Sequence, residues 1–124
     1  MIIVDTSIWI DLFRGNRVII KQVDLLIDSN SILGLEPVFA ELLQGAKSEF
    51  EIEFINKYWQ DLNRTEEKGL WLEAGYHSSK YRWKANGVSL IDAFIIAVAW
   101  KHDYKIWTLD KKLAQAAGKK FIYQ

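Results

Sequence analysis

The chain has 124 residues, about half of them hydrophobic, with 16 basic and 16 acidic side chains. This length predicts a single domain spanning residues 1–124 with one hydrophobic core, and the richness in aromatic residues argues against disorder. The lack of cysteine excludes disulfides and thiolate zinc sites and favours the cytoplasm. Two acids interrupt the apolar N-terminus, so we expect neither a signal peptide nor a membrane span.

The charges are unevenly distributed along the chain. Residues 1–79 hold 7 basic against 13 acidic side chains, whereas residues 80–124 hold 9 against 3. A basic C-terminal third would attract a polyanion if its charges share one face, and Arg82, Lys84 and Lys111 are the candidate substrate-binding residues. Scattered solvated charges are an equally good explanation.

Short apolar runs alternate with helical patterns along the chain. Buried strands are predicted at 1–4, 31–35 and 104–109, a last strand at 121–123 and a weak one near 62–65. Helices are predicted at 7–13, 18–28, 38–43, 49–61, 67–85 and 89–102, followed by a short one between Asp110 and Gly118. Pro37 suits a first helical position, and the helix at 89–102 is apolar almost all round, which implies burial. This alternation predicts an α/β fold in which helices sandwich a parallel sheet.

Four acids lie where chemistry is expected in such a fold, although each also has a structural explanation. Asp5 directly follows the first strand and is also placed to cap a helix. Glu41 lies among apolar residues one turn into a helix, where an exposed helix stripe is the alternative. Asp92 completes a capping box with Ser89, and Asp110 is placed to cap the short helix after it.

The four acids gain meaning as a set. Two follow strands and two lie near the starts of helices on the same side, so the fold would gather them at one edge of the sheet. Clustered carboxylates repel one another unless a cation neutralises them. An all-oxygen ligand set suits Mg²⁺ or Mn²⁺, which could support hydrolysis of a phosphodiester by water.

Other sequence features suggest less. No phosphate-binding glycine loop, zinc-protease motif or Ser-His-Asp arrangement is present, and His77 and His102 are expected at the surface. The six tryptophans are expected mainly in the core or at a partner interface, although an exposed Trp83 between two basic residues would be able to stack on a base.

Four segments resemble the acidic motifs of the PIN-domain family, and more closely those of VapC-type toxins of toxin–antitoxin modules. They are VDTSIWIDLF at 4–13, FAELLQGA at 39–46, SLIDAFIIAVA at 89–99 and WTLDKKL at 107–113. The resemblance spans nearly the whole chain, and its motif acids fall on Asp5, Glu41, Asp92 and Asp110, the expected catalytic and metal-binding residues. Thr6, Ser7 and Thr108 match the accompanying hydroxyls, which would orient a carboxylate or a water.

The resemblance implies a three-layer α/β/α fold with a central, mostly parallel sheet of four to five strands. It also implies a Mg²⁺- or Mn²⁺-dependent endoribonuclease that cleaves structured RNA such as tRNA or rRNA. Such proteins usually form homodimers and are inhibited by a cognate antitoxin. The segment 61–70 is more polar than the strand usually found there, so we expect a short or irregular edge. A housekeeping RNA-processing nuclease, a DNA nuclease or phosphatase, and a non-catalytic nucleic-acid-binding module are the alternatives.

Overall fold

Three short parallel strands lie at the centre of the molecule. In the computed structural model, which describes residues 1–124, β1 (Ile2–Val4) lies between β2 (Ile32–Leu33) and β3 (Lys105–Trp107). Ile3 pairs with Leu33 on one side and with Ile106 on the other, and all three are buried. Strands that are covered on both faces need apolar residues at successive positions, which explains why the run at 1–4 lacks a polar alternation.

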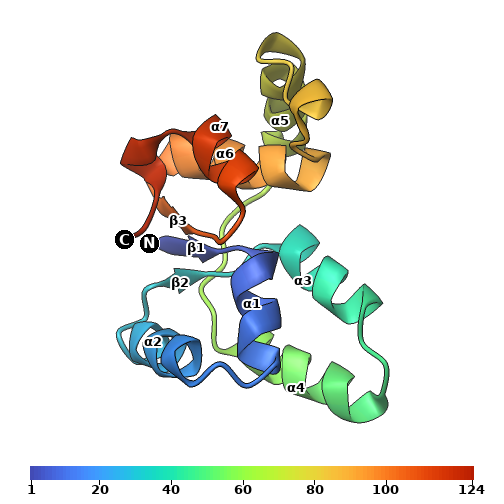
Figure 1. Ribbon diagram of the computed structural model, residues 1–124, viewed down its shortest axis with the longest axis vertical. Helices are drawn as coiled ribbons and strands as arrows, with labels where there is room; N and C mark the ends of the chain where they lie inside the picture. The colour runs from blue at the N-terminus through green and yellow to red at the C-terminus, as the bar shows by residue number, and fades with distance from the viewer.

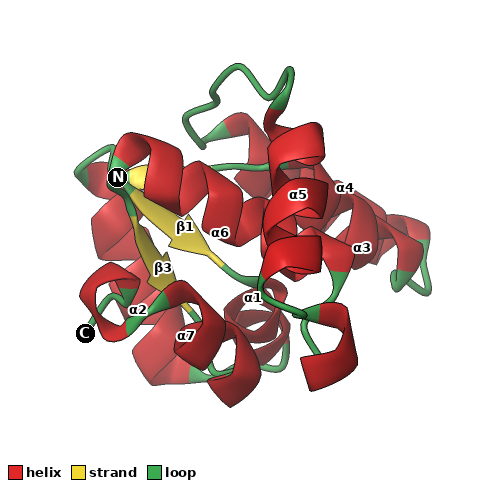
Figure 2. Cartoon of the chain, turned by 90° about the horizontal axis from the view of Figure 1, so that it is seen from above, coloured by secondary structure: helices red, strands yellow, loops and turns green.

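Helices cover both faces of this sheet. They are α1 (Thr6–Phe13), α2 (Arg17–Asp28), α3 (Glu36–Gln44), α4 (Glu49–Gln60), α5 (Leu70–Lys80), α6 (Leu90–His102) and α7 (Lys111–Ala117). Figure 1 shows α6 and α7 on one side of the strands and α1 and α2 on the other, and Figure 2 shows β1 and β3 side by side. The predicted α/β fold with a parallel sheet between helices is therefore confirmed.

The predicted number of strands is wrong, because the sheet has three strands and not four or five. Residues near 62–65 contribute only one bridge, between Asn63 and Leu33, and the segment 121–123 contributes one, between Ile122 and Ile106. At the first edge, the bridge consists of hydrogen bonds from Asn63 N to Ile32 O at 3.1 Å and from Gly34 N to Asn63 O at 2.7 Å, and the Asn63 side chain also donates to the carbonyl oxygens of Asn30 and Ile32. This edge has the irregularity that its polar sequence predicted.

The second edge ends early for a different reason. A 3₁₀ turn, η2 (Lys119–Phe121), occupies the start of the predicted last strand. It follows Gly118, whose φ of 96° turns the chain sharply after α7. One pairing hydrogen bond remains, from Tyr123 N to Ile106 O at 2.8 Å.

The predicted helix at 67–85 is also shorter than expected. It begins after Gly69, which has a φ of 83°, and ends at Lys80 as α5. Arg82 adopts a left-handed φ of 57°, which interrupts the helix before the 3₁₀ turn η1 (Lys84–Asn86). A smaller correction concerns α3, which begins at Glu36, so that Pro37 takes its second position and not its first. A proline is tolerated there because the N–H groups of the first helical turn have no acceptor within the helix.

The hydrophobic core is continuous and contains 29 buried residues. Helix α6 runs through it, with every residue from Ala93 to Ala99 buried, as its uniformly apolar sequence predicted. Trp9 on α1 is 1% exposed and donates from Nε1 to Val4 O at 3.2 Å, which ties α1 to the end of β1. No helix is both long enough and apolar enough to cross a membrane.

Candidate active site

Asp5 directly follows β1 and is the only buried charged residue, with 5% of its surface exposed. Its carboxylate makes no capping hydrogen bond to α1, so the helix-cap explanation for this side chain is wrong. Instead, Oδ2 accepts from Ser7 Oγ at 2.9 Å and from Thr108 Oγ1 at 2.8 Å. Two hydroxyls therefore fix one oxygen of this buried carboxylate and supply the hydrogen bonds that a polar group needs inside the fold.

These two hydroxyls also connect α1 to the loop between β3 and α7. Thr108 Oγ1 accepts from Asp110 N at 2.9 Å, and Ser7 Oγ accepts from Leu109 N at 3.0 Å. The hydroxyl oxygens lie 3.5 Å from each other. Segments about 100 residues apart in sequence thus meet at Asp5, and the position of Asp110 depends on Thr108.

Asp92 lies in the first turn of α6 and has the capping box that its sequence predicted. Ser89 Oγ accepts from Asp92 N at 3.1 Å, and Asp92 Oδ2 accepts from Ser89 N at 3.3 Å. Partial burial raises the pKa of Asp92, the hydrogen bonds from Ser89 lower it, and the charges of Asp5 and Asp110 raise it further. The structure therefore brings Asp5, Asp92 and Asp110 into one electrostatic environment.

Asp110 caps α7, as its local sequence predicted. Its Oδ1 accepts from Lys112 N at 2.8 Å and from Leu113 N at 3.2 Å. β3 ends at Trp107, so Asp110 follows the strand by three residues and not directly. Capping leaves the second oxygen, Oδ2, without a hydrogen-bond donor.

Glu41 lies in the second turn of α3 and is exposed. Its Oε1 accepts from Thr6 Oγ1 at 3.0 Å, which links it to the residue after Asp5. The charges that raise the pKa of Asp92 are those of Asp5 and Asp110, and the contact with Thr6 is the link between Glu41 and these aspartates. It lines two cavities, one of about 600 Å³ beside α5 and one of about 810 Å³ beside α4.

All four carboxylates share one feature. In each, one oxygen accepts a hydrogen bond and the other accepts none: the fixed oxygens are Asp5 Oδ2, Glu41 Oε1, Asp92 Oδ2 and Asp110 Oδ1. The free oxygen of Asp5 is not among the buried atoms that lack a partner, so it keeps contact with solvent. Oriented carboxylates with free oxygens have the donor chemistry that hard divalent ions prefer.

The side chains do not form a closed cage for an ion. No group of three or more Asp, Glu, His or Cys side chains is arranged to hold a metal ion directly. Mg²⁺ in proteins usually has one or two carboxylate ligands and retains several waters. The donor set thus fits a hydrated ion held by few direct contacts.

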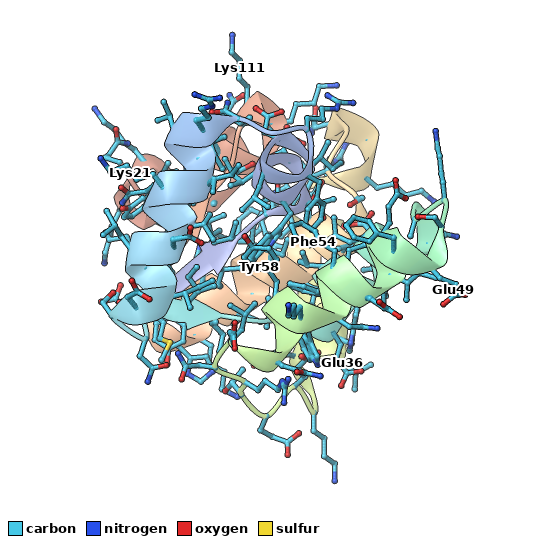
Figure 3. The ribbon with its side chains drawn as sticks, turned by 90° about the horizontal axis from the view of Figure 1, so that it is seen from below. Lys21, Glu36, Glu49, Phe54, Tyr58 and Lys111 are labelled. Atoms are coloured by element: carbon cyan, nitrogen blue, oxygen red, sulfur yellow. The ribbon has the colours of Figure 1, made fainter.

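The predicted substrate-binding residues, Arg82, Lys84 and Lys111, are all exposed. Figure 3 shows Lys111 pointing away from the body of the molecule. Trp83, between Arg82 and Lys84, is only 4% exposed, so the suggestion that it offers a free stacking surface is wrong. Trp83 packs against Trp100, with ring centroids 5.5 Å apart, next to the left-handed turn at Arg82.

The two histidines are not simple surface residues. His77 and His102 are each partly buried, with one ring nitrogen that has neither solvent contact nor a hydrogen-bond partner. His77 packs edge to face against Trp100, with ring centroids 5.1 Å apart, and His102 stacks on Tyr104. The sequence signal for the contacts of His77 was Tyr81 four residues further on, at the end of α5, whose ring stacks on His77 with centroids 6.2 Å apart.

Comparison with known families supports the same assignment as the geometry. The model of the PIN domain matches residues 2–119, which include all four candidate acids. No curated protein gives a significant match. PIN domains are typically metal-dependent nucleases, and the family generally uses divalent metals. The chain belongs to the PIN domain family.

Proposed function

We propose that this PIN domain is the toxin component of a type II toxin–antitoxin module, a VapC-type endoribonuclease that cleaves structured RNA such as tRNA or rRNA. Membership of a nuclease family and the resemblance of the four acidic segments to VapC-type toxins support this role. The observation that carries the proposal is the set of four carboxylates that are each oriented through one oxygen and free at the other.

In this proposal Asp5 and Asp92 are the direct ligands of Mg²⁺ or Mn²⁺, and Glu41 and Asp110 complete the site through water or a second ion. When bound, the ion lowers the pKa of an attacking water and stabilises charge on the phosphoryl oxygens. Ser7 and Thr108 orient Asp5, and Thr6 orients Glu41, through the hydrogen bonds described above. Such supporting contacts typically change metal affinity or activity by about 10- to 100-fold.

RNA would approach over the basic C-terminal third. Arg82, Lys84 and Lys111 are exposed and free to contact phosphates, and Lys111 directly follows Asp110. Phosphate contacts of this kind are independent of sequence and weaken as salt rises. They would draw RNA toward the acids in spite of the zero formal net charge of the whole chain.

The partners in this proposal are a cognate antitoxin and a second copy of the chain, in the cytoplasm. An apolar cavity of about 810 Å³ lies between α1, α3 and α4, and its lining includes Ile10, Phe50 and Phe54. Phe50 is 76% exposed and Phe54 40% exposed, and Figure 3 shows Phe54 beside Tyr58 on α4. Because Thr6 and Glu41 line the same cavity, an antitoxin segment seated there would continue toward the carboxylates.

Cleavage of RNA by the purified protein tests this function. We expect cleavage with Mg²⁺ and its loss in Asp5→Asn and Asp92→Asn, which remove a charge and keep the side-chain volume. Asp103→Asn is the matched control, because Asp103 is exposed at the end of α6 and its left-handed φ of 58° suits Asn. Retained cleavage by a folded Asp92→Asn protein would contradict the assignment of the site.

Three further measurements separate the alternatives. Growth arrest on expression of the wild type, but not of Asp5→Asn, supports a toxin over a housekeeping RNA-processing nuclease. Labelled RNA, DNA and phosphate-ester substrates distinguish a ribonuclease from a DNA nuclease or phosphatase. Calorimetry that detects no binding at millimolar Mg²⁺ or Mn²⁺ would favour a non-catalytic binding module.

A further inference from the structure

The C-terminal part of the chain contains a groove between η1 and α7. Its volume is about 430 Å³, within the range of sites for small ligands. Its lining consists of apolar and uncharged polar side chains with one cation: Trp83, Asn86, Val88, Lys112, Gln115 and Ala116. No acidic residue lines the groove, whereas Glu41 lines each of the two cavities beside α4 and α5.

The polar groups of the groove are held in different ways. Asn86 donates from Nδ2 to Arg82 O at 2.8 Å, which orients its amide and leaves Oδ1 as a free acceptor. Lys112 lies across Gly87, since a Cβ at Gly87 would come within 2.9 Å of Lys112 Cδ. Gln115 is exposed, and its amide makes no intramolecular hydrogen bond, so both its donor and its acceptor are available.

The groove lies beside two of the candidate acids. Val88 precedes Ser89, whose hydroxyl forms the capping box with Asp92. Lys112 donates its backbone N–H to Asp110 Oδ1 at 2.8 Å. Two parts of the groove lining are therefore joined, through these contacts, to the segments that hold Asp92 and Asp110.

The cavity beside α5 is lined by acidic side chains, in contrast to the groove with its single lysine. It has a volume of about 600 Å³ and includes Glu36, Glu41 and Glu67 in its lining. Burial raises the pKa of Glu67, and the charges of Glu36 and Glu66 raise it further, which indicates a crowded acidic surface. Phosphate groups would be repelled there, so a polynucleotide is better accommodated on the side of Lys112.

We propose that the groove of η1 and α7 binds the base of a nucleotide next to the cleaved phosphodiester and thereby sets the sequence preference of cleavage. This inference rests on the proposed nuclease function. The amides of Asn86 and Gln115 match the donors and acceptors along a base edge, and Lys112 suits a base oxygen or ring-nitrogen acceptor. Ala116 lines the groove beside the largely buried Trp83 and Val88, and these residues form the apolar part of its wall.

The test compares adjacent lysines on α7. A randomised RNA pool is cleaved by wild type, Lys112→Ala, Gln115→Ala and Lys111→Ala, and the bases flanking each cut are sequenced. We expect Lys112→Ala and Gln115→Ala to reduce the preference at one flanking position by about 10-fold, because each base contact contributes to discrimination. Lys111→Ala is expected to slow cleavage of all sequences alike, as a phosphate contact does.

A binding measurement without metal supplies an independent readout. The wild-type protein is titrated with each of the four nucleoside 5′-monophosphates, and the side-chain amide signals of Asn86 and Gln115 are followed by NMR. Shifts of these signals support the groove. Unshifted signals, or an unchanged cleavage preference in both groove variants, overturn the inference while the nuclease function stands. Absence of any cleavage by the wild type refutes both proposals.

Discussion

Removal of the Thr108 hydroxyl is expected to loosen the candidate site without changing its charge. Thr108 Oγ1 donates to Asp5 Oδ2 at 2.8 Å and accepts from Asp110 N at 2.9 Å. Thr108→Val keeps the side-chain shape and removes both hydrogen bonds. Asp5 is 5% exposed, so water replaces the lost donor poorly, and only Ser7 continues to hold Oδ2.

The expected cost follows from these two contacts. A hydrogen bond to a charged group contributes about 1.5–3 kcal/mol to stability and a neutral one about 0.5–1.5 kcal/mol. Thr108 is only partly buried, so water restores some bonding to Asp110 N. We therefore expect the free energy of unfolding to fall by about 2–3 kcal/mol, which corresponds to a decrease in Tm of roughly 10 °C for a domain of this size. Because Asp5 is less well oriented, Mg²⁺ affinity should fall by about 10- to 100-fold.

Urea unfolding in the absence of metal, followed by tryptophan fluorescence, measures the first effect, and Mg²⁺ titration by calorimetry measures the second. Thr108→Ser retains the hydroxyl and should recover most of both. Thr65→Val is a control for the loss of a threonine hydroxyl, because Thr65 makes no side-chain hydrogen bond and lies outside the site. If Thr108→Val unfolds like Thr65→Val and binds Mg²⁺ like the wild type, the hydroxyl does not organise Asp5.

Three further outcomes follow from burial and packing. The pKa of Asp92 is raised chiefly by burial, so the native state binds this proton more tightly than the unfolded chain does, and the resulting stability is lost as pH rises through the raised pKa. The urea midpoint of the metal-free wild type, compared with that of Asp92→Asn at the same pH, should therefore fall from about pH 4 upward. A difference between the two midpoints that does not change with pH would contradict the raised pKa. At pH 7, Mg²⁺ should raise the Tm of the wild type more than that of Asp92→Asn, and equal increases would place the ion elsewhere. Gly34→Ala places a Cβ 2.9 Å from the Trp59 ring and 3.1 Å from Leu62 Cβ. Thermal unfolding should therefore show a decrease of about 1–3 kcal/mol in the free energy of unfolding. An unchanged Tm would mean that Trp59 and Leu62 move aside without cost.

Local sequence patterns were sufficient for much of the fold. The apolar runs at 1–4 and 104–109 contain β1 and β3, and the uniformly apolar run after Ser89 is the buried helix α6. The capping roles of Asp92 and Asp110 were also predictable, because a cap depends on residues two or three positions away. The edges of the sheet were not, since pairing there ends where the chain turns away from its neighbour, as it does in the 3₁₀ turn η2 after Gly118.

The four acids were identified from their places along the chain, at strand ends and near helix starts. By itself, the sequence determined which carboxylates an α/β fold would direct to one edge of the sheet, because strand direction and helix starts are local properties. Only the tertiary structure decided how each is held. The Asp5 carboxylate depends on Thr108, 103 residues away, and the burial of Trp83 depends on packing against Trp100. Orientation, burial and pKa arise from contacts between distant segments, so only the folded chain distinguishes a helix cap from a carboxylate that also has an oxygen free for a ligand.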